Sequence, residues 1–413
     1  MAAFSQLHWS LMNQLGPIGI DKALQTHAVR AFFLAMTLIK PVSCLLAQDV
    51  VRLDPTLPYQ AERLSPVTYE VDFSVVVTPP YKTKKLCVWL PLPNSDAAQE
   101  VTEIKLSSFP IELEPRVAIE PVFGNRFAYF EFNSPQGAQI IRHQFQIKVW
   151  ELRWHIDPAK IVSVDEWPTS FDRYRQGDAQ SVVVDERFRK LLDEIVPQRN
   201  STAQDFRSVM SWVQANFEYD HHDASLRASA EHALEKRRGH CSDYHSFCAS
   251  LGRILGVPTR MTYGINTFPK NSPSHCKLEA FLPPYGWVSF DVSETQKLVE
   301  EIRSSTDIDE AKRTALIDLA QARLAGGFRD NTWFLQTRGT DYDLAPPASK
   351  RVPVIRTAHV EADGVPLPDP DPADSSQRTF SWMTMHKYRA DRKVTHPFTD
   401  RSTLESQDSR TRP

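Results

Sequence analysis

One segment near the middle of the chain constrains the fold most, because a cysteine stands at the start of an apolar-faced helix and two short strands follow. Between residues 244 and 255 apolar side chains recur every three or four positions, which predicts an amphipathic helix that begins at or beside Cys241. Gly239 suits the turn ahead of this helix, and Gly256 with Pro258 predicts its end. A thiol at a helix N-terminus meets the positive end of the helix dipole, which lowers the pKa of the thiol. Cys241 is therefore a candidate nucleophile.

A histidine and an aspartate follow on segments that we expect to form neighbouring strands. The segment TRMTYGI predicts one strand, His275 opens a second alternating segment, and a turn at residues 283–286 leads into a third that ends at Asp291. The chain between Cys241 and His275 is long enough to bring this hairpin back across the start of the helix, so we expect the imidazole of His275 to face the sulfur of Cys241. Asp291 would then hold the second ring nitrogen and stabilise the imidazolium. The three residues form a candidate triad of nucleophile, base and orienting acid.

Several separately spaced elements between residues 217 and 295 resemble the transglutaminase-like superfamily. They are the segments G-x-C-x-D-Y, G-V-P-T-R, H-C and G-W-V-x-x-D, with the residues Gly239, Cys241, Asp243, Tyr244, Gly256, Pro258, Arg260, His275, Gly286, Trp287 and Asp291. The resemblance implies an α+β fold with a papain-like core, in which the cysteine-bearing helix packs on an antiparallel sheet. It also implies that Cys241 is the nucleophile, that His275 is the general base and acid, and that Asp291 orients the histidine.

The chain departs from this resemblance two positions after the histidine. Many members of the superfamily have an aromatic residue there, whereas this chain has Lys277, with Cys276 in between. The departure leaves the substrate preference open but does not affect the triad. We expect the backbone amide of Cys241 to be one donor of the oxyanion hole. The second donor is not placed by the sequence, and Trp212 and Tyr219 are upstream candidates for it.

Other residues of this region suit structural roles. Cys248 lies on the apolar face of the helix, so we expect it in the core. Asp243, in the first turn, suits the helix dipole, and we expect Arg260 to form an ion pair near the core. Cys276 is either a buried strand residue, which we prefer, or a thiol that pairs with Cys241 under oxidation.

The spacing of cysteines and histidines favours neither a disulfide framework nor a metal site. The five cysteines are odd in number and scattered along the chain, unlike a set that pairs into a framework. No Cys/His spacing matches a zinc framework, and no acidic EF-hand-like loop supports a calcium requirement. We therefore expect neither a metal nor a cofactor.

The length and the change of pattern along the chain predict two globular units with an extension at each end. The 413 residues exceed one typical domain. Alternating β-rich runs predict a β-sandwich-like domain at 60–165, for which we prefer a stabilising role over substrate positioning. A transglutaminase-like catalytic domain follows at 180–345, entered through helices at 186–195 and 202–217. The proline-rich region after it predicts a partly disordered C-terminal extension at 346–413.

The first residues resemble an export signal. Residues 31–39 form an apolar run that is too short to span a bilayer and is similar to the central part of a signal peptide, with cleavage near Ala47. We therefore treat 1–47 as an N-terminal extension or signal-like segment and expect an exported protein, periplasmic or extracellular, with peripheral or no membrane association. Lys40 and Pro41 argue against this interpretation, and a cytoplasmic protein is the alternative.

Charge and the candidate triad together define the expected activity. A formal net charge of −3 gives no electrostatic reason to expect a nucleic-acid partner. The predicted function is thiol-dependent acyl transfer at amide bonds of a protein or peptide substrate, by peptide or isopeptide hydrolysis or by transamidation, through a thioester. Two alternatives stay open: an acyltransferase similar to arylamine N-acetyltransferases, and a non-catalytic peptide-binding or scaffold protein on the same core. Competent residues at all three triad positions favour an enzyme.

Overall fold

The computed structural model describes residues 52–268, 273–370 and 382–405. The signal-like segment predicted at 1–47 therefore lies outside the described residues. Among the residues that are described, no helix is both long and apolar enough to cross a membrane.

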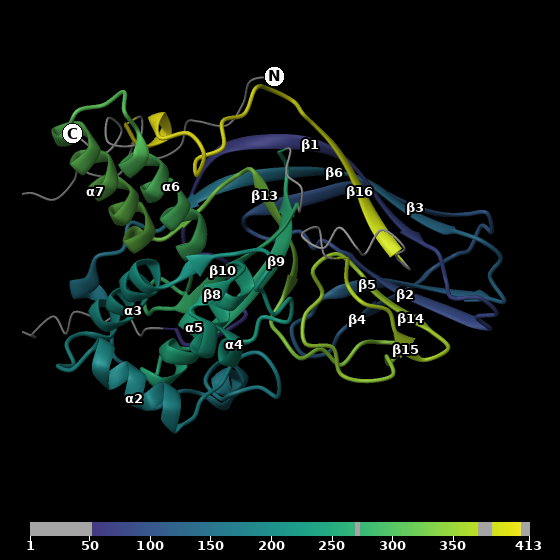
Figure 1. Ribbon diagram of the computed structural model, residues 1–413, viewed down its shortest axis with the longest axis horizontal. Coiled ribbons are helices and arrows are strands. Elements are labelled where there is room, and N and C mark those ends of the chain that lie inside the picture. Colours follow the sequence, from purple (N-terminus) through teal and green to yellow (C-terminus); the bar gives the residue numbers. More distant parts are fainter. Residues whose placement is uncertain (1–51, 269–272, 371–381, 406–413) are drawn as a thin grey trace, which may run out of the picture. The chain divides into compact units, whose positions relative to one another are not determined.

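Two antiparallel sheets pack face to face after residue 60, as the alternating pattern predicts (Figure 1). Their strands from this region are β1 (Glu62–Val77), β3 (Gln99–Phe109) and β6 (Gln139–Arg153) in the first sheet, and β2 (Lys85–Leu92), β4 (Arg116–Ile119) and β5 (Arg126–Asn133) in the second. Along β6 every second side chain from Ile141 to Val149 is buried. The apolar side chains among them meet Leu90 and Phe130 of the other sheet in one core, as in a β-sandwich.

Strands from beyond residue 346 complete both sheets of this sandwich. The strand β14 (His359–Ala362) pairs with β2, β15 (Val365–Pro366) pairs with β14, and β16 (Trp382–Ala390) pairs antiparallel with β1. Part of the C-terminal extension predicted at 346–413 therefore belongs to the two sandwich sheets. Leu404 is likewise fully buried beside Leu298 and Leu316, although the final residues have no apolar period. These segments become ordered by packing and pairing with residues that are distant in the sequence. Local composition does not indicate such partners.

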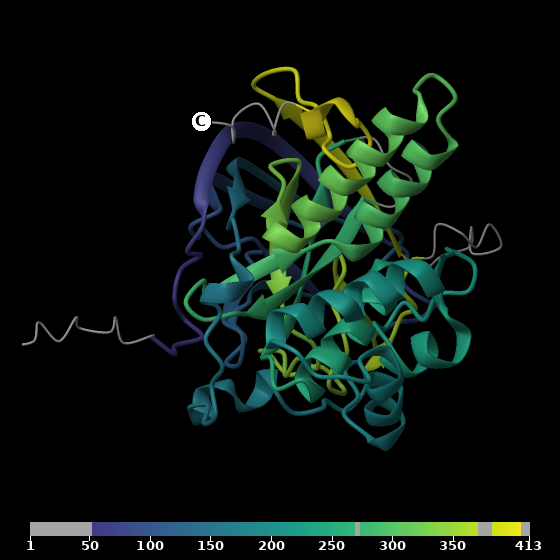
Figure 2. The ribbon, with the colours of Figure 1, turned by 90° about the vertical axis from the view of Figure 1, so that its left-hand side faces the viewer.

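The remaining elements form the α+β core that the sequence predicts. A four-stranded antiparallel sheet has the order β11 (Trp287–Phe290), β10 (Ser274–Phe281), β9 (Thr259–Asn266) and β13 (Trp333–Arg338). The helices are α2 (Glu186–Ile195), α3 (Thr202–Asn216), α4 (Ala230–Lys236), α5 (Cys241–Ile254), α6 (Val292–Ser304) and α7 (Glu310–Gly326). Helix α5 packs on β10 and β9, and α6 packs beside α7 (Figure 2). Side chains of Asp185 and Ser201 cap α2 and α3.

The sandwich and the α+β core share backbone and side-chain contacts. The short strand β12 (Phe328–Arg329) pairs with β6, so a segment of the core extends the first sandwich sheet. Ile265 and Phe334, from the core sheet, belong to the same apolar cluster as the inner faces of the sandwich. Tyr59, ahead of β1, donates a hydrogen bond to Glu279 of β10 at 2.6 Å. The core sheet is thus supported from its sandwich side by buried contacts.

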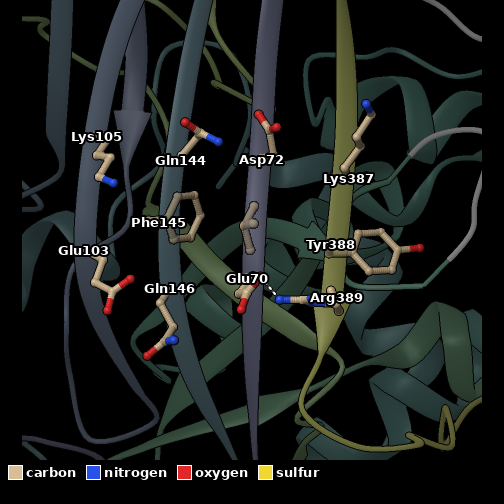
Figure 3. Close-up of a pocket in the computed structure, with 11 residues that line it drawn as sticks. Glu70, Asp72, Glu103, Lys105, Gln144, Phe145, Gln146, Lys387, Tyr388 and Arg389 are labelled. Atoms are coloured by element: carbon tan, nitrogen blue, oxygen red, sulfur yellow. Dashed lines mark hydrogen bonds and ion pairs between the residues drawn. The ribbon is translucent and has the colours of Figure 1, made fainter.

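The first sandwich sheet also has a groove, with a volume of about 380 Å³, on which polar side chains gather (Figure 3). Its lining comes from β1, β3, β6 and β16. In it Arg389 donates to Glu70 at 2.6 Å, and both side chains are mostly exposed.

Candidate active site

Cys241 begins helix α5, as the sequence predicts, and the turn before it depends on glycine. Gly239 has a φ of 149°, and a Cβ at this position would lie 2.4 Å from Asp243 Oδ2. Asp243 accepts a hydrogen bond from the backbone amide of His240 at 3.0 Å and also binds Ser225. It therefore does more than favour the helix dipole, because it ties a preceding loop to the helix start. Cys241 keeps 8% of its surface exposed.

The other two predicted site residues meet beside this cysteine. His275, the second residue of β10, binds Asp291 through its Nε2 nitrogen at 2.7 Å. Asp291 is the N-cap of α6 and accepts from the backbone amide of Glu294 at 3.1 Å, so helix formation fixes its orientation. The side chain of His275 also hydrogen-bonds with that of Cys241. The structure thus brings the three residues together with His275 in the middle.

Burial and neighbouring groups move the pKa values of the pair in opposite directions. A hydrogen bond from Cys276, and then the charge of His275, hold the pKa of Cys241 well below its usual range against the effect of burial. Burial lowers the pKa of His275, but the charges of Asp291 and Cys241 outweigh it and raise that pKa to about 9. Near neutral pH the arrangement therefore favours a thiolate beside an imidazolium.

A buried lysine completes the environment of Asp291. Lys277 Nζ lies 2.6 Å from Asp291 Oδ2 and 2.9 Å from Asp330 Oδ2, and all three side chains are about 1% exposed. Burial opposes the ionised form of Asp291, yet the charges of His275 and Lys277 hold its pKa well below its usual range. In the sequence, Lys277 stands out only as a departure from the resemblance, and Asp330 does not stand out at all. Asp330 lies between β12 and β13, where no motif marks it.

Of the two upstream aromatic residues, Tyr219 is the one that packs with Cys241. Tyr219, at the end of β7 (Glu218–Tyr219), accepts a hydrogen bond from the backbone amide of Cys241 and belongs to the same apolar cluster as the cysteine. Trp212 packs instead against the larger apolar cluster that contains Phe247, and it is stacked on Phe247 with 6.0 Å between the ring centroids. The hydroxyl of Tyr219 therefore stands at the amide that we expect to bind an oxyanion.

A chain of hydrogen bonds runs behind the cysteine. The backbone amide of Val292 donates to Nε2 of His245 at 3.1 Å, which leaves the proton of this ring on Nδ1. That nitrogen lies 3.3 Å from the sulfur of Cys276, whose side chain in turn hydrogen-bonds with Cys241. Burial lowers the pKa of His245 to about 4, so the ring is neutral at pH 7. Cys276 is a buried strand residue whose thiol donates to the candidate nucleophile.

The residues that we expect in structural roles are found in them. Cys248 is fully buried in the core, and burial raises the pKa of its thiol. Arg260 binds Glu279 at 2.6 Å and lies 4.0 Å above the ring of Trp287. Among the described residues, no group of three or more His, Cys, Asp or Glu side chains is arranged to hold a metal ion.

Comparisons with known proteins give the same picture of the core. Residues 189–292 match the sequence model of the transglutaminase-like superfamily, and this range contains all three predicted site residues. A curated relative from Haemophilus influenzae, described as an uncharacterized protein, is 23% identical over 216 residues. The alignment covers 45% of this chain and 56% of that relative, so the chain spans little more than half of its length.

Solved structures show the likeness of the fold. A structure from Cytophaga hutchinsonii, described as a putative cysteine protease, aligns with a TM-score of 0.56 at 14% identity and covers 82% of this chain and 95% of that one. The periplasmic domain of TgpA from Pseudomonas aeruginosa aligns with a TM-score of 0.31 at 16% identity, covering 59% of this chain and 75% of that one. The first of these likenesses, with its high coverage, shows that sandwich and core together form a known arrangement.

Proposed function

We propose that this chain, which carries a transglutaminase-like domain at residues 189–292, is a cysteine-dependent enzyme that transfers acyl groups from amide bonds. The observation that supports the proposal most is the buried hydrogen bond between His275 and Asp291 beside a cysteine whose pKa is lowered. Such a pairing is costly to bury, and it suits a nucleophile, its base and an orienting acid.

The proposed reaction begins with attack of the Cys241 thiolate on the carbonyl carbon of the substrate amide. The oxygen of the tetrahedral intermediate accepts a hydrogen bond from the backbone amide of Cys241, which in the free protein donates to Tyr219. It accepts a second hydrogen bond from the Tyr219 hydroxyl. The His275 imidazolium then protonates the departing amine, and a thioester on Cys241 remains. Asp291 holds the ring through Nε2 and stabilises its charge throughout.

The thioester is then passed either to water, which completes a peptide or isopeptide hydrolysis, or to an amine, which completes a transamidation. In both cases neutral His275 removes a proton from the acceptor. The substrate in this proposal is a protein or peptide. The outcome depends on how far the bound substrate excludes water from the thioester.

A direct test incubates the purified protein with a glutamine-containing casein and a labelled amine, and with a broad panel of peptides. We expect amine incorporation or peptide cleavage by the wild type and its loss in Cys241→Ala. The matched control is Cys87→Ala, because Cys87 lies on β2 of the sandwich. Equal inactivity of wild type and Cys241→Ala, together with iodoacetamide labelling of Cys241 no faster than free cysteine, would favour the non-catalytic alternative.

The oxyanion step has its own test. Tyr219→Phe keeps the ring that packs against Cys241 and removes the hydroxyl. We expect kcat to fall by about 10²-fold with little change in KM, since the hydroxyl acts on the intermediate more than on the bound substrate. Steady-state kinetics on the best substrate of the panel measure both constants. A rise in KM by a similar factor, without a fall in kcat, would instead assign Tyr219 to substrate binding.

We also propose that the protein is exported, on the strength of the apolar run at 31–39. N-terminal sequencing of the protein from its own cells tests this. We expect a mature terminus near residue 48, and an intact Met1 would remove the proposal.

A further inference from the structure

The side chain of Lys277 lies between two carboxylates that come from different parts of the chain. Asp291 follows β11, whereas Asp330 lies in the connection between β12 and β13. Lys277 contacts Asp291 at 2.6 Å and Asp330 at 2.9 Å, and the rings of Trp333 and Phe398 lie about it at 5.3 and 5.0 Å. A lysine that is only 1% exposed is removed from bulk water, so the two carboxylates compensate its charge.

Lys277 and His275 share one oxygen atom. Oδ2 of Asp291 accepts from His275 Nε2 at 2.7 Å and from Lys277 Nζ at 2.6 Å. The other oxygen, Oδ1, accepts from the amide of Glu294 at 3.1 Å. Any change in the charge of Lys277 therefore acts directly on the carboxylate that holds the imidazolium.

We propose that Lys277 is a positioning residue of the candidate active site and that, together with Asp330, it sets how strongly Asp291 holds the His275 imidazolium. The catalytic meaning of this proposal rests on the proposed function, but its electrostatic content does not. Lys277 fixes Asp291 in its ionised form and in one orientation. As a cation beside a cation it also weakens the hold on the imidazolium, and the Asp330 carboxylate limits this effect.

Other ionisable groups face this cluster from the elements packed against it. His245 of α5 lies 3.9 Å from Asp291 Oδ1. The charge of Arg323, from α7, acts on both Asp291 and Asp330, and that of His396 acts on Asp330. Cys241 acts on His275 from the other side. None of these groups lies between Lys277 and Asp291, which are in direct contact.

The test uses three variants of the full chain with opposite expected effects. Lys277→Met removes a positive charge and should raise the pKa of the His275 imidazolium by about one unit. Asp330→Asn removes a negative charge and should lower that pKa by a similar amount. The double variant Lys277→Met/Asp330→Asn should give a value between those of the single variants. NMR titration of protein labelled at the histidine Cε1 carbon, with His275 assigned by loss of its signal in His275→Gln, measures all four proteins.

The outcomes separate this proposal from a structural role and from the proposed function. Shifts of opposite sign support the proposal even if no substrate is turned over, in which case the proposed function alone fails. If the enzyme is active, the alkaline limb of kcat/KM should move in the same directions. No shift, or shifts of one sign, would overturn the proposal and leave Lys277 with packing alone. If Lys277→Met does not fold, Asp330→Asn and the charge-neutral double variant still decide the matter.

Discussion

Two ion pairs of this protein have the same length and different surroundings. Arg389 and Glu70 meet at 2.6 Å in the groove of the sandwich (Figure 3), with side chains that are 76% and 58% exposed. Lys277 and Asp291 also meet at 2.6 Å, but each is 1% exposed. Water and salt screen the first pair, so its contribution to stability is about 0–1 kcal/mol. Loss of one partner from the second leaves a buried charge uncompensated. Burial, and not the distance between the charged atoms, therefore decides how much such a contact contributes to stability.

Loss of the buried pair should change stability the most. Asp291→Ala leaves Lys277 and His275 without their shared carboxylate, and we expect the free energy of unfolding to fall by about 3–5 kcal/mol. Urea unfolding monitored by tryptophan fluorescence measures it. A loss below about 1 kcal/mol would mean that the buried pair behaves like an exposed one.

The pH dependence of stability gives the next effect. The pKa of His275 is raised to about 9 in the folded protein, so its contribution is fully present below about pH 6.5 and is lost as the pH rises toward 9. In Cys241→Ala we expect the free energy of unfolding to fall by about 1–3 kcal/mol across this window, whereas in the wild type the lowered pKa of Cys241 offsets this fall, because the thiol takes up a proton on unfolding while the imidazolium releases one. Unfolding at a series of pH values measures the slope, and the double variant Cys241→Ala/His275→Gln should lack it. An equal slope in Cys241→Ala and in the double variant would contradict the raised pKa.

A smaller effect is expected at Cys276. Cys276→Ala removes the hydrogen bond that contributes most to the lowered pKa of Cys241. We expect the pKa of Cys241 to rise by about one unit, which slows its alkylation at pH values below that pKa. The rate of iodoacetamide modification across pH 4–8 measures the change, with Cys87→Ala as the control. A profile identical to that of the wild type would show that Cys276 does not support the thiolate.

The smallest effect is expected in the groove. Glu70→Ala leaves Arg389 in water, so we expect the free energy of unfolding to change by no more than about 1 kcal/mol, and by less at high salt. Urea unfolding at low and at high sodium chloride measures it. A loss as large as that in Asp291→Ala would remove the contrast between the two pairs.

The local parts of the site could be predicted from the sequence because they depend on near neighbours. The start of α5 at Cys241 and the need for glycine at position 239 follow from helix periodicity and turn chemistry. The meeting of His275 and Asp291 follows from a hairpin between adjacent strands. The catalytic roles of these residues stay predictions.

The parts that could not be predicted depend on segments that are far apart in the chain. Asp330 reaches Lys277 from a connection after α7, and no local pattern records this contact. The strand β16 is an edge strand whose side chains, after the buried Trp382, alternate between exposed and half-buried. Its order comes from pairing with β1, near the other end of the described chain.

This pairing of β16 with β1 has a consequence for the order of events on the ribosome. The strand β16, which pairs with the free side of β1, is synthesised only after the whole α+β core. One edge of the first sheet therefore waits unpaired while the core emerges, and it is open to wrong partners during that time. Completion of the sandwich then requires closure of a loop that includes the core itself, which makes the last step of folding a slow, long-range one.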